Sequence, residues 1–153
     1  LPLRMASNMQ YLQLDRMLQE KYAYTAEDDC WINMFMDEKG FRWGYGGEYG
    51  LSVCLEKGDY WVTVSMGEAV PLEIYGVEFY PIHVYVNGLY LQELRIYQGN
   101  EEADIVFEVP AAYLKEGEND ILFRSEPWKP KDFGKEDYRE MGVNIRRVQF
   151  WAE

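Results

Sequence analysis

The segment IHVYVNGLYLQELRI, residues 82–96, decides the fold class. Positions 82, 84 and 86 are aliphatic and alternate with His83 and Tyr85, so an extended strand here has one apolar face. Asn87-Gly88 supplies the two positive-φ residues of a type I′ turn, after which a return strand begins. Because a hairpin with one apolar face is not stable alone, we expect further strands to cover it.

The rest of the chain repeats this pattern of short apolar runs separated by turn signals. The segments expected as strands are 31–36, 49–56, 59–66, 82–86, 89–96, 103–109, 120–124 and 142–151. We expect 49–56 and 59–66 to form a second hairpin at Lys57-Gly58, and the glycine-rich segment 41–50 to be a loop that displays its rings. The alternation slips near Arg146-Arg147, which predicts a β-bulge. The fold class expected is all-β, an antiparallel β-sandwich of jelly-roll type.

Residues 1–22 are expected to form a helix that precedes the sandwich. Ser7 is a candidate N-cap, Gln10 completes a capping box, and apolar residues follow at helical spacing. This helix would pack on the sandwich or on a neighbouring domain. We therefore divide the chain into 1–28, the helix and its linker, and 29–153, the β-sandwich module. Because the chain begins with Leu rather than Met, we expect it to be a piece of a longer protein.

Composition and charge restrict the partners. A chain of 153 residues is most simply one domain with a core of its own. A formal net charge of −12 argues against nucleic acid and anionic membrane, since both need a positive patch. Cys30 and Cys54 have no metal-ligand spacing and are expected to be buried free thiols. Unpaired cysteines favour the cytoplasm, whereas a binding module of an extracellular enzyme would be secreted, so the compartment stays open.

The sequence argues against most catalytic chemistry. His83 is the only histidine, which excludes a multi-histidine metal centre and leaves a Ser or Cys nucleophile without a base. Paired carboxylates are harder to dismiss among 27 Asp and Glu, so a glycan-degrading enzyme remains an alternative. Asp28, Asp29 and Asp37 lie in expected loops and are candidate calcium ligands without a defined spacing. No other cofactor is expected.

Aromatic residues are the most informative feature for function. They make up 16% of the chain, with 13 Tyr and 5 Trp, which is more than a core of this size requires. Sugar C–H faces stack on rings and sugar hydroxyls bond carboxylates and guanidinium groups, although the same residues also suit a protein interface or a packed core. The residues we expect to bind a ligand are Trp43, Tyr45, Glu48, Trp61, Tyr85, Trp128, Asp137 and Arg139.

Several phrases in this order resemble the galactose-binding-like jelly-roll modules attached to bacterial glycosyltransferases and other glycan enzymes. They are GFRWGYGGEYGL at 40–51, GDYWVTV at 58–64, VYVNG at 84–88, FEVP at 107–110, GEND at 117–120 and DYREMGVNIRRVQF at 137–150. Such modules have an Asp-x-Arg-x-Leu-Gly phrase before the last strand, matched here by Asp137, Arg139, Met141 and Gly142, with Met in place of Leu. The resemblance covers about residues 29–153 and implies an accessory, non-catalytic sandwich.

Three functions follow as expectations. The first is a carbohydrate-binding module in which Trp43 or Trp128 stacks on the sugar while Glu48, Asp137 and Arg139 bond its hydroxyls. The second is a structural domain that packs on a catalytic domain of the same polypeptide. The third is a glycan-degrading enzyme.

Two questions about the site stay open in the sequence. Asp137 and Arg139 are either ligand-binding residues or a structural ion pair that holds the last loop. A sheet face carrying Trp61, His83 and Tyr85 is a second candidate surface, suited to an extended chain.

Overall fold

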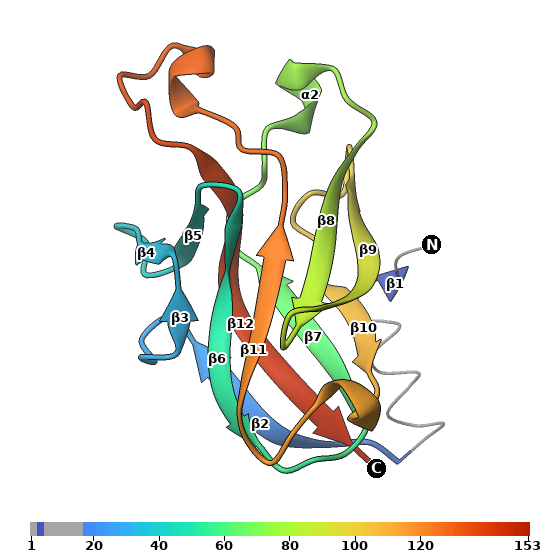
Figure 1. Cartoon of the computed structure of the whole chain (residues 1–153). Helices are drawn as coiled ribbons and strands as arrows, with labels where there is room; N and C mark the ends of the chain where they lie inside the picture. The colour runs from blue at the N-terminus through green and yellow to red at the C-terminus, as the bar shows by residue number, and fades with distance from the viewer. Residues whose placement is uncertain (1–2, 5–16) are drawn as a thin grey trace.

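Two antiparallel β-sheets lie face to face in the computed structural model, which describes residues 3–4 and 17–153 (Figure 1). One sheet has the order β1 (Leu3–Arg4), β10 (Ile105–Val109), β7 (Tyr60–Met66), β12 (Met141–Ala152), β5 (Arg42–Tyr45) and β4 (Met34–Met36), and β2 (Gln19–Thr25) also pairs with β12. The other has the order β3 (Trp31–Ile32), β6 (Glu48–Leu55), β11 (Gly117–Arg124), β8 (Phe79–Val86) and β9 (Leu89–Tyr97). The all-β antiparallel sandwich expected from the sequence is confirmed.

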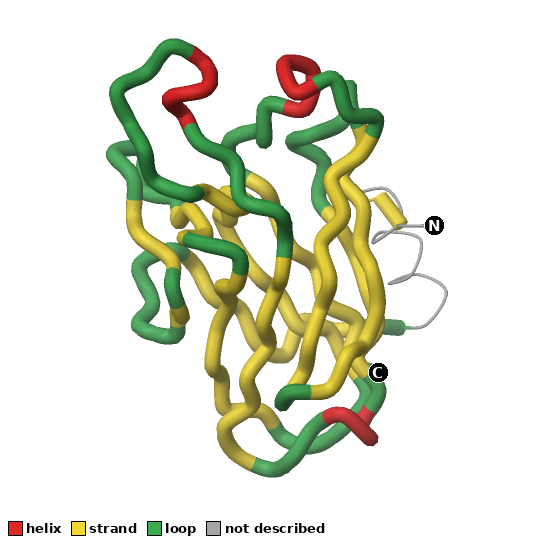
Figure 2. Tube along the Cα trace, turned by 45° about the horizontal axis from the view of Figure 1, so that its top comes forward, coloured by secondary structure: helices red, strands yellow, loops and turns green. Residues whose placement is uncertain are grey.

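Short helical turns lie at both ends of the sandwich. The turns α2 (Leu72–Tyr75) and η2 (Pro130–Phe133) lie at one end, and η1 (Ala111–Tyr113) lies at the other (Figure 2). Among the described residues, no helix is long and apolar enough to cross a membrane.

The central hairpin forms as predicted. Asn87 and Gly88 have φ angles of 50° and 83°, as a type I′ turn requires, and they join β8 to β9. The aliphatic side chains of Ile82, Val84 and Val86 are buried between the sheets, so this strand supplies part of the common core.

One buried tyrosine holds the two sheets close together. Tyr49, from β6, is fully buried, and its ring packs against the backbone of Gly44 and Gly142 in the opposite sheet, where a Cβ would approach the ring to 2.6 and 2.3 Å. The Tyr49 hydroxyl is 2.6 Å from Ser125 Oγ and accepts the Val143 amide N–H at 3.2 Å. The glycines at 44 and 142 are therefore required by contact, not by a turn.

Three local expectations are wrong because the chain changes sheets. Segment 31–36 is two strands, β3 and β4, separated at Asn33, whose φ of 52° carries the chain from one sheet to the other. Strands β6 and β7 are joined at Lys57-Gly58 but belong to different sheets, so they are not a hairpin. Segment 41–50 is not a loop, because it contains β5 and the start of β6.

The expected N-terminal helix is wrong where the structure describes it. Residues 3–4 pair with β10 and residues 19–25 pair with β12, so both are strands. The remainder of the expected helix, residues 5–16, lies outside the described residues. The expected linker up to residue 28 contains β2, which is part of the sandwich.

Two smaller expectations have clear outcomes. The pairing of β12 with β7 slips between Ile145 and Arg147, which confirms the predicted bulge. Both cysteines are free, but Cys54 is exposed, not buried as expected. Partial burial raises the pKa of the Cys30 thiol to about 11.

The close contact between β6 and β11 predicts that Gly50→Ala is strongly destabilising. A Cβ at position 50 would lie 2.0 Å from the Ile121 carbonyl oxygen, which is backbone and cannot rotate away. We expect Gly50→Ala to lower the free energy of unfolding by about 3 kcal/mol or more in urea denaturation. Gly58→Ala, where the nearest atom is 4.0 Å away, is the matched control and should change it by about 0.5 kcal/mol or less. Equal stability of the two variants would contradict the packing described here.

Candidate functional site

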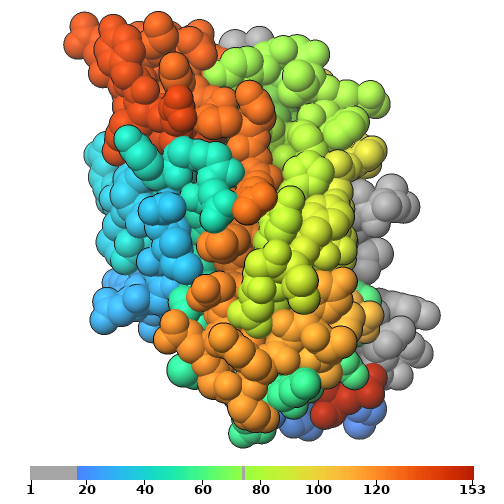
Figure 3. Space-filling model, in the orientation of Figure 1, coloured from blue at the N-terminus to red at the C-terminus, as the bar shows by residue number. Residues whose placement is uncertain are grey.

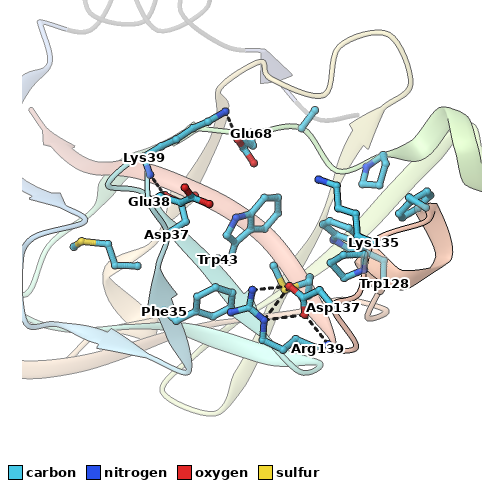
Figure 4. Close-up of a pocket in the computed structure, with 16 residues that line it drawn as sticks. Phe35, Asp37, Glu38, Lys39, Trp43, Glu68, Trp128, Lys135, Asp137 and Arg139 are labelled. Carbon is cyan, nitrogen blue, oxygen red and sulfur yellow. Dashed lines mark hydrogen bonds and ion pairs between the residues drawn. The ribbon is translucent and has the colours of Figure 1, made fainter.

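A groove of about 820 Å³ lies at the end of the sandwich that carries α2 and η2 (Figure 4). Three segments line it: 35–43 from β4 and β5, 68–71 after β7, and 128–141 before β12. These segments are far apart in the sequence, so the groove depends on the sheet pairing that brings them together.

Two tryptophans form the floor of the groove. Trp43 and Trp128 are 6% and 9% exposed, and their ring centroids are 5.4 Å apart in an edge-to-face arrangement. Trp128 Nε1 donates to the Gly142 carbonyl at 2.8 Å. Both rings were expected to be displayed for stacking on a sugar, but their faces are covered by packing. The two rings therefore form the base of the groove and do not offer a face for stacking on a sugar.

An ion pair stacked on a ring forms one wall. Arg139 Nη2 donates to Asp137 Oδ2 at 2.6 Å and Arg139 Nε donates to Asp137 Oδ1 at 3.0 Å. The guanidinium carbon of Arg139 lies 4.3 Å from the centre of the Phe35 ring, and Figure 4 shows the two groups side by side. Tyr45 also packs on Phe35 in an edge-to-face arrangement, with ring centroids 6.5 Å apart. The wall therefore presents an apolar ring and polar groups in fixed positions.

The electrostatics of this wall favour an ionised Asp137. Hydrogen bonds from the Arg139 guanidinium and backbone amide, together with the charges of Arg139 and Lys135, lower the pKa of Asp137 to about 2. Asp137 is thus a hydrogen-bond acceptor throughout the neutral and mildly acidic range.

The opposite wall is also fixed by hydrogen bonds. The Asp37 carboxylate accepts the amide N–H groups of Lys39 and Phe41 at 2.9 and 3.0 Å and the Asn144 side chain at 3.2 Å. Lys39 Nζ forms an ion pair with Glu68, whose backbone N–H donates to Asn144 Oδ1 at 2.7 Å. This wall offers a lysine and two carboxylates to a ligand.

Lys135 extends over the groove from the loop after η2 (Figure 4). Below it, Phe133 packs on Trp128 with a centroid distance of 5.8 Å and on Tyr75 at 5.0 Å. Lys135 therefore adds a cation to the groove lining, beside this packed aromatic cluster.

The sequence-predicted site residues lie in three separate places. Trp43, Trp128, Asp137 and Arg139 line the groove. Glu48 and Tyr85 lie on the five-stranded sheet, where both contact Arg124.

Trp61 lies on the seven-stranded sheet and packs against the buried Leu18 and Val106. The single sheet face expected to carry Trp61, His83 and Tyr85 therefore does not exist, because β7 and β8 belong to different sheets.

Sequence reasoning missed several groove residues. Phe35, Lys39, Glu68 and Lys135 carried no signal of their own. Phe35 reaches the groove because the chain changes sheets at Asn33, and the sequence carries no signal for that change.

The calcium candidates are not gathered into a site. In the part of the chain that the structure describes, no group of three His, Cys, Asp or Glu side chains could hold a metal ion. Asp28 and Asp37 accept backbone N–H groups in their own turns, and Asp29 is exposed. Calcium binding by these residues stays a prediction.

The fold is similar to that of solved carbohydrate-binding modules. A family 35 module from an environmental isolate superposes with a TM-score of 0.58 at 13% identity, over 85% of this chain and 92% of that one. A family 35 module from Clostridium thermocellum has a TM-score of 0.55 at 18% identity, over 86% of this chain and 98% of that one. An exo-β-1,3-galactanase from Phanerochaete chrysosporium has a TM-score of 0.53 at 16% identity, over 86% of this chain but only 29% of the enzyme. No family model and no curated protein sequence matches this chain. At these identities the likeness shows the fold.

The lowered pKa of Asp137 predicts how its ion pair contributes to stability as the pH changes. Because the folded-state pKa is about 2 and the ordinary value is 3.8, the contribution is present above pH 4 and is lost as the pH falls toward 2. We expect Asp137→Asn to lower the midpoint temperature of unfolding by a constant amount between pH 5 and 7. Below pH 4 the difference in midpoint temperature between the variant and the parent protein should shrink. Thermal unfolding across pH 2–7 measures this. A difference that grows on acidification would contradict the described pair.

Proposed function

We propose that this chain is a non-catalytic carbohydrate-binding module that binds a glycan in the groove, as one part of a larger glycan-active protein. The observation that carries the proposal is the stacked unit of Phe35, Arg139 and Asp137. A ring that can lie against sugar C–H groups stands beside a guanidinium and a carboxylate that can bond hydroxyls, and all three are held in place before a ligand arrives.

The opposite wall complements this unit. Lys39 and Glu68 add donors and acceptors on this wall, and Lys135 adds a further donor near Asp137. A glycan with hydroxyls on several sides would use both walls, whereas an apolar ligand would leave these charged groups without hydrogen-bond partners.

The electrostatics of Asp137 favour binding over acid catalysis. A glycosidase needs one carboxyl group whose pKa is raised so that it can act as an acid. The pKa of Asp137 is instead lowered, so this carboxylate suits hydrogen bonding to hydroxyls.

The structural neighbours support an accessory role. The two family 35 modules are carbohydrate-binding modules by name, and the chain spans nearly their full length. In the galactanase, the matching part is under a third of the enzyme. A catalytic domain in the same polypeptide is the partner that this arrangement favours.

The proposal is tested by titrating the domain with a panel of neutral and acidic mono-, di- and trisaccharides, using isothermal calorimetry. We expect Arg139→Ala to weaken binding of any hit by about tenfold or more, because the charge-assisted hydrogen bonds and the order of the wall are lost. Arg139→Lys should weaken it as well, since lysine keeps the charge but not the planar fork.

Arg147→Ala is the matched control. Arg147 is an exposed arginine on the bulge of β12, away from the groove, and its removal should leave the affinity unchanged. A hit whose affinity is the same for the parent protein and both Arg139 variants would contradict the placement of the site. Failure of every short saccharide to bind the folded domain would contradict glycan binding in the groove.

A further inference from the structure

The outer face of the five-stranded sheet carries a row of rings and ion pairs that the groove does not use. We call it the β8–β9 stripe and define it by Phe79, Tyr85, Tyr90, Glu93, Arg95 and Arg124. Figure 3 shows this side of the molecule, with β6, β11, β8 and β9 running across the surface.

One half of the stripe is built around Tyr85. The guanidinium carbon of Arg124 lies 4.1 Å from the centre of the Tyr85 ring, and Arg124 Nε donates to Glu48 at 2.7 Å. The Tyr85 and Tyr90 rings have centroids 5.4 Å apart at 64°. His83 extends the contact, with its ring 5.8 Å from Tyr90.

The other half repeats the same arrangement. Arg95 Nε donates to Glu93 at 2.6 Å, and its guanidinium carbon lies 4.2 Å from the centre of the Phe79 ring. Phe79 in turn packs on Tyr97, with centroids 5.9 Å apart. His83 Nε2 lies 3.8 Å from Glu93, which joins the two halves.

A bulge in β9 makes the stripe continuous. Leu94 and Ile96 are buried, so Glu93 and Arg95 face outward, and regular alternation would turn Tyr90 inward. The pairing of β8 with β9 slips between Val84 and Tyr85, so that Tyr90 lies opposite Tyr85 instead. Tyr90 is 49% exposed. Bulges re-aim side chains next to binding sites in this way.

The charges of the stripe are balanced internally. Arg124 is paired with Glu48, and Arg95 with Glu93, while the whole chain carries a net charge of −12. An acidic polymer would be repelled by the negative net charge. A basic polymer would find the carboxylates of Glu48 and Glu93 already paired with arginines. A neutral, hydroxyl-rich chain fits these conditions.

We propose that the β8–β9 stripe binds the interior of an extended neutral polysaccharide, as a second site separate from the groove. The exposed ring of Tyr90 provides a stacking surface, and the half-buried rings of Phe79 and Tyr85 add apolar contacts beside it. Each guanidinium has N–H donors beyond the one in its ion pair. Because the stacks and ion pairs already fix these side chains, little entropy is lost on binding. The inference rests on the proposed carbohydrate-binding function but not on the groove as its site.

Affinity electrophoresis with soluble galactomannan, xyloglucan and β-1,3-galactan tests the proposal. We expect at least one of these polymers to retard the parent domain, and the double variant Tyr85→Ala/Tyr90→Ala to need about tenfold more polymer for the same retardation. Arg147→Ala, which removes an exposed arginine outside both the groove and the stripe, should remain as retarded as the parent domain. Tyr138→Ala removes a tyrosine that is 71% exposed on another part of the surface, and is the control for ring loss.

Each outcome has a defined meaning. Equal retardation of the parent domain and the double variant, or no retardation of the parent by any of the three polymers, would overturn the stripe as a site. Short saccharides that bind the parent domain and the double variant alike would still support the groove, so the two proposals fail separately. If thermal unfolding shows that the double variant is not folded, Arg95→Gln replaces it, and the same loss of retardation is expected.

Discussion

The packing of Tyr49 between the two sheets is the constraint on which the groove depends. Its ring occupies space that only glycines at 44 and 142 leave open, and its hydroxyl bonds Ser125 and the amide of Val143. A buried hydroxyl without partners would cost about 1–3 kcal/mol, so these contacts are strongly favoured. Because they hold residues 125 and 142–143, they fix both ends of the segment that supplies Trp128, Asp137 and Arg139.

A second tyrosine reinforces the same point. The Tyr80 hydroxyl lies 3.0 Å from Ser125 Oγ and donates to the Glu126 carbonyl. Ser125 Oγ is therefore hydrogen-bonded to two tyrosine hydroxyls, one from β6 and one from β8. The long segment before β12 begins at a rigid point, which is what a preorganised binding wall requires.

Sequence patterning predicted those parts of the fold that local chemistry determines. The Asn87-Gly88 turn, the inward alternation of Ile82, Val84 and Val86, and the bulge of β12 follow from residues close together in the chain. The crossings at Asn33 and Lys57-Gly58 could not be predicted, because a turn signal does not state whether the next strand pairs with the last or joins the other sheet. The sequence predicts a loop at Gly44 and Gly50, whereas these glycines leave space for the Tyr49 ring and for the Ile121 backbone on the neighbouring strand.

Some features of the candidate site are likewise predictable from the local sequence, and others depend on tertiary packing. Asp137 and Arg139 were singled out from a short phrase, and the structure brings them to a groove. Trp43 and Trp128 also line the groove, but composition does not encode exposure, and both are buried. Phe35 and Lys135 enter the groove through tertiary packing that no local pattern reports.

The central claim is that the groove binds a glycan between its two walls, and backbone amide chemical-shift mapping by NMR tests it most directly. A saccharide that binds the domain is titrated into ¹⁵N-labelled protein. We predict saturable shifts concentrated at residues 35–39, 67–69 and 135–139. If the saccharide binds and the amide chemical shifts of all three segments stay unchanged, the account is contradicted.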